Sequence, residues 1–356
     1  MLVMGYLGAV IGAGFASGQE IVQFFVAYGF GGLKGVLLST VLFAVFGGLL
    51  LYVAHIQKAG NYQDILAYLM GDKAGKVIDF LLSIFLFLGI STMLSASGAV
   101  FHEHLYLPKI LGILLAYLLV VLFIFTGKKG LLFSFNILVP VKFLLLCLIA
   151  GYIVFSFKGT PVEEYTKYLG ANFLLPWPIS SVLYVAYNFT LAMVVLTEYQ
   201  SITSRRNGII GAVWGGLVLG ILLLLNYLAL CKFLPVVLNY EVPMLYITGK
   251  ISIEVKYVYT IVLWVGILTT AIANAYGFSQ RWSSFTGLNY TFCLLWCMTM
   301  ALPIAMQSFS SLVSAIYPIF GLLGIIILIA LIYRAVKDII KKLYYNIIQL
   351  ISRIRE

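Results

Sequence analysis

Long apolar runs separated by short polar or glycine-rich breaks organise almost the whole chain. A helix that crosses a membrane needs about 20 apolar residues, because the hydrocarbon core is about 30 Å thick and each residue adds about 1.5 Å. Measured in this way, the chain contains ten candidate spans, at residues 2–28, 33–56, 77–101, 108–126, 131–157, 177–199, 207–231, 254–277, 289–306 and 311–333. The pattern predicts an all-α polytopic membrane protein with about ten transmembrane helices.

Composition supports the same class and excludes others. The chain has 356 residues, of which 63% are hydrophobic and 10% charged, against about 45–50% and about 25% in soluble domains. This balance excludes a soluble enzyme, a disordered chain and a nucleic-acid binder, and makes the lipid bilayer the expected surroundings. The four cysteines all lie in apolar stretches, so they indicate no disulfide framework.

The placement of Lys and Arg predicts the orientation. With the N-terminus inside, fourteen of the 22 basic residues fall on the cytoplasmic side, seven on the outer side and one, Lys142, within a span. Cytoplasmic loops retain cations, so we expect both termini in the cytoplasm. The tail, residues 334–356, repeats apolar residues at helical spacing with cations between them, which predicts an amphipathic helix along the inner leaflet.

Span 1 contains the sequence IGAGFASGQE, Ile11 to Glu20. Glycine costs about 1 kcal/mol relative to alanine inside a helix, so the stretch from Gly12 to Gly18 is expected to unwind. Unwound backbone at membrane depth must line a cavity or be buried in protein. Close helix packing through small residues is the alternative. The polar residues Ser17, Gln19 and Glu20 favour unwinding, because packing glycines need no buried carboxylate.

Span 6 has polar residues at its centre, in the sequence Tyr187-Asn188-Phe189-Thr190. An interruption between two half-helices is expected there, although the absence of Gly and Pro leaves an ordinary helix with a polar face open. Spans 1 and 6 begin two five-helix halves, residues 1–157 and 177–333, joined by an extracellular connection at 158–176. Five is odd, so the halves have opposite topology. Interrupted helices in matching positions of inverted halves indicate a transporter's midplane site.

The string GAGFASGQEIVQFF from Gly12 to Phe25, with the YNFT centre of span 6, resembles the YkvI-like family of bacterial membrane proteins. That family belongs to the amino acid–polyamine–organocation superfamily. The resemblance implies the LeuT fold in a bacterial inner membrane, a small solute bound between helices 1, 3, 6 and 8, and coupling to protons or sodium. It further implies that the first break holds the solute's carboxylate and that the residues at the centre of span 6 face it. The residues of the first break are Gly12, Ala13, Gly14, Phe15, Ala16, Ser17 and Gly18.

Lys142 lies eleven residues into span 5, about 16 Å from its inner end and thus near the midplane. A charge there costs at least about 2.5–3.5 kcal/mol, so a functional role is expected. The resemblance implies that its ammonium replaces a sodium ion, held by helix 1 carbonyls and by helix 8 groups, for which Thr269, Thr270 and Asn274 are the candidates. A lysine that releases its proton would couple transport to the proton gradient. A permanently charged one would be structural.

Further polar and aromatic residues complete the candidate site. For Glu20 three roles are open: binding a solute amine, carrying the coupling proton, or pairing with Lys142; a hydrated outward position is the alternative. Ser95 is a candidate solute ligand, and Phe15, Tyr184, Tyr187 and Phe189 are assigned to a pocket or gate. Asp79 and Glu198 are expected to form inner salt bridges with Lys76 or Arg205. The apolar, proline-broken segment 233–252 predicts a hairpin lid over the outer vestibule.

An intramembrane enzyme is disfavoured, because no histidine lies in the middle of a span to activate a serine. No metal site or cofactor is expected, since His102 and His104 are two residues apart and point to different sides of a helix. The sequence thus favours a secondary active transporter that moves an amino acid or a related zwitterion or amine, by alternating access and with protons. A sodium symporter and a nutrient-sensing receptor of the same fold are the alternatives. The sequence identifies no protein partner.

Overall fold

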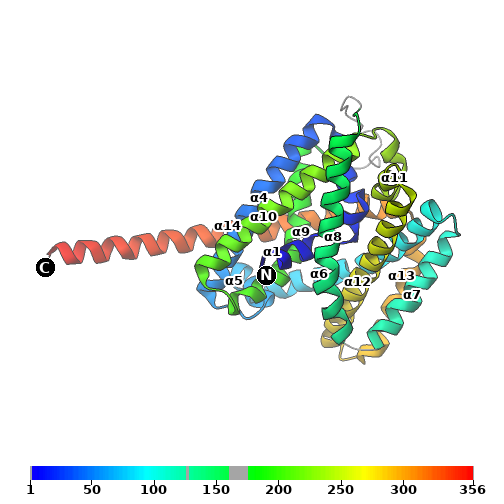
Figure 1. The fold of residues 1–356 in the computed structure, drawn as a ribbon. Coiled ribbons are helices and arrows are strands. Elements are labelled where there is room, and N and C mark those ends of the chain that lie inside the picture. Colours follow the sequence, from blue (N-terminus) through cyan, green and yellow to red (C-terminus); the bar gives the residue numbers. More distant parts are fainter. Residues whose placement is uncertain (1, 126–127, 160–174, 356) are drawn as a thin grey trace.

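The computed structural model describes residues 2–125, 128–159 and 175–355, which form helices joined by short turns (Figure 1). The first span is divided into α1 (Leu2–Val10), α2 (Ala13–Ser17) and α3 (Gln19–Phe24). The other spans are α4 (Phe30–Gln57), α6 (Asp72–His104), α7 (Lys109–Phe125), α8 (Lys128–Ser156), α9 (Trp177–Glu198), α10 (Arg205–Cys231), α12 (Ile253–Thr286), α13 (Tyr290–Ala305) and α14 (Phe309–Arg355). Short helices lie between them: η1 (Val26–Tyr28), α5 (Tyr62–Met70), η3 (Tyr199–Ser201), η4 (Val236–Asn239) and α11 (Pro243–Gly249).

The ten-span prediction is confirmed. Within the described residues, seven helices are long and apolar enough to cross a membrane, and two shorter apolar helices, α7 and α13, lie beside them. The divided first span completes the set. The predicted extracellular connection at 158–176 falls largely on residues 160–174, which lie outside the described part of the chain.

The helices pack so that the divided first span lies inside the bundle. α10 packs along α4 and α12 along α6, which brings the second half of the chain onto the first, and α14 packs along α9 within the second half. α1 contacts α9 and α10, and α2 contacts α12. Ile11 and Phe15 are almost completely buried. Apolar side chains on the outer faces of the helices remain exposed, as expected where lipid replaces water as the surroundings.

Two helix boundaries differ from the sequence prediction. α12 continues through Arg281 to Thr286, where Gly287 ends it in the left-handed conformation with φ 73°. The Gly/Ser/Arg stretch around Arg281 is therefore helix, because the first residue that favours a left-handed cap is Gly287. The tail was expected as a separate helix along the leaflet, but it continues α14 without a turn and projects from the bundle (Figure 1).

Candidate functional site

The helical path of span 1 is interrupted twice. Ile11 and Gly12 lie between α1 and α2, and Gly18 separates α2 from α3. Gly18 has φ 83°, a left-handed conformation that favours glycine. Gly12 has an extended backbone with φ −75°, which any residue can adopt, and a Cβ added there would meet no atom within 4 Å. The predicted interruption is present, with one helical turn preserved between its two ends.

Lys142 reaches this interruption from α8. Its Nζ donates a 3.0 Å hydrogen bond to the carbonyl oxygen of Ile11, the first residue after α1, and the side chain is 4% exposed. On the α12 side, Lys142 lies against Gly266, where an added Cβ would be 3.3 Å from the lysine Cδ. Thr269 and Thr270 donate to the Gly266 carbonyl within α12. The expected position of Lys142 beside helices 1 and 8 is observed, but these two hydroxyls bond within their own helix.

Two other candidates lie away from the break. Asn274 packs its amide against Gly89 on α6, eight residues along α12 from Gly266, and a Cβ added at Gly89 would overlap this amide. Ser95 donates a 2.6 Å hydrogen bond to the Gln307 carbonyl, between α13 and α14. The position of a residue around its helix sets where its side chain points. The Asn274 and Ser95 side chains point toward neighbouring segments of the bundle and not toward the first break.

Glu20 joins the broken helix to α9. Its Oε2 accepts a 2.5 Å hydrogen bond from the Tyr187 hydroxyl. Its Oε1 lies over Gly14, so closely that an added Cβ there would overlap it. The carboxylate is thus held between α2, α3 and α9 and is 4% exposed. The hydrated outward position considered for Glu20 is wrong, and so is the salt bridge with Lys142, which bonds Ile11 instead.

The interruption expected at 187–190 is not observed, since α9 is one helix from Trp177 to Glu198. The polar side chains are satisfied locally: Asn188 Nδ2 donates to the Tyr184 carbonyl and Thr190 Oγ1 to the Ala186 carbonyl, each four residues back. No glycine or proline breaks this stretch. Phe189 packs on Phe46 of α4, with ring centroids 5.8 Å apart, and so points away from Glu20. Of the four residues, Tyr187 alone is shown bonded to the broken helix.

To the predicted Tyr184 and Tyr187 the structure adds two aromatic residues that the sequence did not single out, Phe24 and Tyr317. The Tyr187 ring lies 4.9 Å from Tyr317 on α14 and 5.7 Å from both Tyr184 and Phe24. We call these four rings the aromatic cluster. Pro318 follows Tyr317 inside α14, but no sequence signal related that position to span 1.

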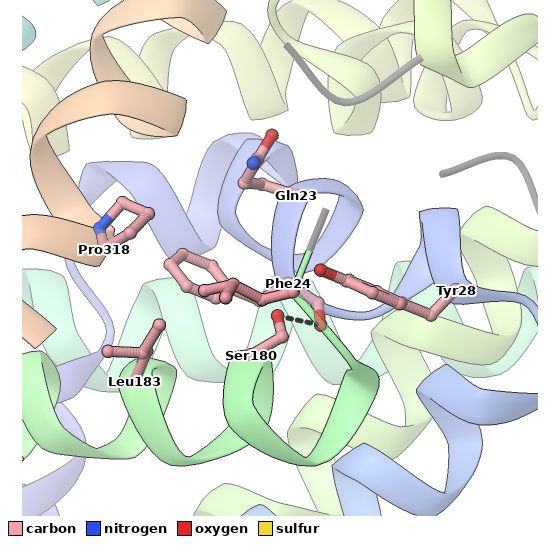
Figure 2. A pocket seen from close by; sticks show the side chains of 7 residues that line it. Gln23, Phe24, Tyr28, Ser180, Leu183 and Pro318 are labelled. Atoms are coloured by element: carbon pink, nitrogen blue, oxygen red, sulfur yellow. Dashed lines mark hydrogen bonds between the residues drawn. The ribbon is translucent and has the colours of Figure 1, made fainter. Parts of the chain in front are cut away.

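A small pocket lies beside Phe24, one of the four rings of this cluster (Figure 2). Ser180 on α9 donates a 3.0 Å hydrogen bond to the Phe24 carbonyl at the end of α3. The pocket opens between α3, α9 and α14, and is lined by Gln23, Phe24, Tyr28, Leu175, Ser180, Leu183 and Pro318.

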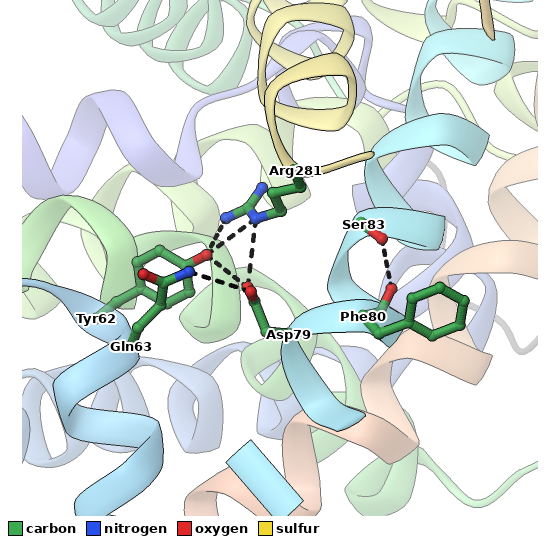
Figure 3. A network of polar contacts seen from close by, with 6 residues as sticks. All are labelled: Tyr62, Gln63, Asp79, Phe80, Ser83 and Arg281. Carbon is green, nitrogen blue, oxygen red and sulfur yellow. Dashed lines mark hydrogen bonds and ion pairs between the residues drawn. The ribbon is translucent and has the colours of Figure 1, made fainter. Parts of the chain in front are cut away.

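A polar network joins α5, α6 and α12 at one end of the bundle, here called the α5 end (Figure 3). Arg281 forms a 3.3 Å ion pair with Asp79, and the Tyr62 hydroxyl donates to Asp79 at 2.6 Å while accepting from Arg281. Burial raises the pKa of Tyr62 to about 12, so it stays a neutral donor. The expected partner of Asp79, Lys76, was wrong: Lys76 is exposed.

At the opposite end, here called the α11 end, two carboxylates hold the predicted lid segment. Glu103 on α6 accepts the backbone N–H groups of Glu241 and Val242 at 2.8 and 3.1 Å. Glu241 in turn accepts the N–H of Phe309 at the start of α14. The segment, which contains η4 and α11, is therefore fixed to α6 and α14 through the residues between these two short helices.

Comparison with known proteins identifies relatives of this chain in sequence and in fold. No family model matches the chain. It is 31% identical over 335 residues to the membrane protein YkvI of Bacillus subtilis (strain 168), covering 94% of this chain and 95% of the relative. It is 28% identical to the protein YyaD of the same organism, covering 91% and 93%.

Among solved structures, MhsT in complex with L-phenylalanine matches with a TM-score of 0.64 at 15% identity, covering 92% of this chain and 87% of that one. The inward-facing conformation of Mhp1 matches with a TM-score of 0.62 at 16% identity, covering 91% and 72%. These likenesses show the fold, and the identity with YkvI shows the family. The chain belongs to the YkvI-like family of membrane proteins and has the LeuT fold.

Proposed function

We propose that the protein is a secondary active transporter that moves an amino acid or a related amine or zwitterion by alternating access, coupled to protons. One observation carries the proposal: the Lys142 ammonium bonds the Ile11 carbonyl at the interruption of span 1. An intramembrane cation held by the free carbonyl of a broken helix is the arrangement in which transporters place a coupling ion.

Proton exchange at Lys142 supplies the coupling. While protonated, the ammonium links α8 to the end of α1 and lies against Gly266 on α12. Loss of the proton removes the charge and turns the amine into a weaker partner for the carbonyl. The α1 and α12 helices are then released from α8, which permits one helix group to rock against the other.

Contacts at the two ends of the bundle support alternating access. The Arg281–Asp79 ion pair with Tyr62 closes the α5 end, and Glu103 and Glu241 hold the lid at the α11 end. Both sets are polar contacts between segments from different parts of the chain, so one set can break while the other holds. With both termini in the cytoplasm of a bacterial inner membrane, the α5 end faces inward and the α11 end outward.

The solute class rests on size and chemistry. A neighbour of the same fold is solved with L-phenylalanine, and the region beside Glu20 offers a carboxylate, tyrosine hydroxyls and aromatic rings. Such groups suit a small solute that carries an amine on an apolar body.

Reconstituted protein tests the proposal. Proteoliposomes with an imposed pH gradient should accumulate a radiolabelled solute from a panel of amino acids and amines, and collapse of the gradient with an ionophore should stop uptake. Lys142→Ala should abolish or uncouple uptake, whereas Lys256→Ala, a lysine at the start of α12, should leave it unchanged. Uptake that requires sodium and ignores pH would reject the proton assignment, and wild-type uptake by Lys142→Ala would reject the role of the lysine.

A further inference from the structure

The Glu20 carboxylate has one polar contact and a second, unused oxygen. Oε2 accepts from Tyr187, while Oε1 lies over the glycine backbone of α2. At 4% exposure, water provides little compensation. A buried carboxylate normally needs a cation or several hydrogen bonds, because its removal from water costs several kcal/mol.

No side chain in the described residues supplies that cation. The ion pair found there is Asp79 with Arg281 at the α5 end, and at the α11 end the His104 imidazole lies 3.5 Å from Glu103, the residue before it. Lys142 is buried inside the bundle, but its ammonium is bonded to the Ile11 carbonyl and not to Glu20. The positive charge that would complement an ionised Glu20 must therefore come from a ligand or a proton.

Aromatic rings surround the same position. Tyr187, which bonds Glu20, contacts Phe24, Tyr184 and Tyr317 within the aromatic cluster. Tyr184 and Tyr317 are both within electrostatic range of the carboxylate. Ring faces attract alkylammonium groups, most strongly where water is excluded. A carboxylate beside several rings therefore favours an organic ammonium over an inorganic ion.

The Tyr184 hydroxyl gives an independent sign of a missing ligand. Tyr184 is completely buried, yet its hydroxyl has no hydrogen-bond partner. Buried hydroxyls in folded proteins are almost always bonded, because an unsatisfied one costs about 1–3 kcal/mol. An ammonium group bound to Glu20 can donate to a neighbouring hydroxyl oxygen as well, since it carries up to three N–H donors.

We propose that Glu20 and the aromatic cluster bind the ammonium group of the transported solute, which is a small organic amine that needs no carboxylate. This rests on the proposed transport function and narrows it. A solute carboxylate at the first break would lie beside Glu20, because Glu20 already covers Gly14. Two carboxylates at that distance repel each other in a low-dielectric site.

Matched probes separate the solute classes. Leucine, isoamylamine and 4-methylpentanoate share a branched alkyl chain. Leucine carries an ammonium and a carboxylate, isoamylamine the ammonium alone, and 4-methylpentanoate the carboxylate alone. Phenylalanine, 2-phenylethylamine and 3-phenylpropanoate form the same set on an aromatic body. Binding to the purified full chain is measured by the shift of its thermal unfolding midpoint with ligand concentration. At least one amine should bind as tightly as its amino acid or more tightly, and the carboxylates should not bind.

Two variants test the assignment to Glu20. Glu20→Gln keeps the shape but removes the charge, and should weaken amine binding at least tenfold. Gly14→Ala keeps Glu20 but displaces its Oε1, and should also weaken binding. Glu254→Gln, which removes an exposed carboxylate at the start of α12, should bind like the wild type. Size-exclusion profiles identify any variant that does not fold.

Each other result contradicts the proposal. Binding of amino acids with no binding of the amines would show that a carboxylate is required, and proton-driven uptake of that amino acid would leave the transport function standing. Unchanged amine affinity in folded Glu20→Gln and Gly14→Ala would move the ammonium site elsewhere. Amine binding that keeps its affinity in Glu20→Gln while uptake loses its pH dependence would assign Glu20 to proton transfer alone. Absence of binding by all six probes would also reject the proposal.

Discussion

The Tyr259 hydroxyl on α12 donates a 2.6 Å hydrogen bond to the carbonyl of Ala16 on α2. This bond attaches the single helical turn between the two interruptions to span 8. Both groups are buried. It adds a polar link to the packing contacts of α2 with α11 and α12.

Tyr259→Phe should therefore loosen the broken helix. It leaves the Ala16 carbonyl without this donor, at a cost of about 1–3 kcal/mol for an unsatisfied buried group. The thermal unfolding midpoint in detergent should fall, and uptake should fall with it. Tyr257→Phe removes a hydroxyl from the exposed face of the same helix and is the matched control. Equal midpoints for the two variants would show that the Ala16 contact does not stabilise α2.

The two ends of the interruption should differ in their tolerance of alanine. Gly18 has φ 83°, which costs an L-residue about 1–2 kcal/mol. A Cβ there would also lie 2.8 Å from Met244 Cγ on α11. Gly12 has an ordinary φ and open space around it. Gly18→Ala should lower the unfolding midpoint clearly and Gly12→Ala hardly at all. A larger loss for Gly12→Ala would show that Gly12 meets a tighter neighbour in another conformation.

The first interruption could be predicted from sequence because glycine content and a buried polar run are local properties. The depth of Lys142 followed from helix length, since 1.5 Å per residue fixes how far along a span a residue lies. Which neighbour it meets depends on helix rotation and packing. Thr269 and Thr270 bond within α12, and Gly266 makes the contact with Lys142 instead.

The prediction for span 6 failed for a related reason. Polar residues in the middle of an apolar helix can serve a binding site or bond the carbonyl one turn back, and sequence does not distinguish these cases. Asn188 and Thr190 each bond the carbonyl one turn back. The pairing of Glu20 with Tyr187, and the approach of Tyr317, join three spans that are distant in sequence. The pattern of residues within one helix does not determine which residues of other spans it contacts.

The contributions of Asp79 and Arg281 at the α5 end to unfolding stability should be coupled. Asp79→Asn and Arg281→Gln should each lower the unfolding midpoint, and the double variant should lose less than the sum of the two, because the second change removes a partner already lost. Lys76→Gln, an exposed position on α6 near Asp79 in sequence, is the control and should match the wild type. Additive losses would show that Asp79 and Arg281 contribute independently, through Tyr62 or packing.

Glu241 should make stability depend on pH at the α11 end. Burial raises its pKa above the ordinary value of 4.5, and the nearby Glu103 adds to this, while Lys109 and the N–H groups of Phe309 and Ser310 oppose it. The folded state thus binds this proton more tightly than the unfolded chain. The resulting stabilisation is present below pH 4.5 and is lost as the pH rises through the raised pKa.

Glu241→Gln should remove this dependence while keeping an oxygen that accepts the Phe309 N–H. Unfolding midpoints of wild type and variant are compared between pH 4 and pH 8. The wild-type midpoint should fall relative to that of the variant as the pH rises, because the ionised carboxylate is the unfavourable form in this buried position. Asp72→Asn, which removes an exposed carboxylate at the α5 end, controls for the loss of one negative charge. Parallel curves for wild type and Glu241→Gln would show that the hydrogen bonds to the carboxylate offset its burial in full.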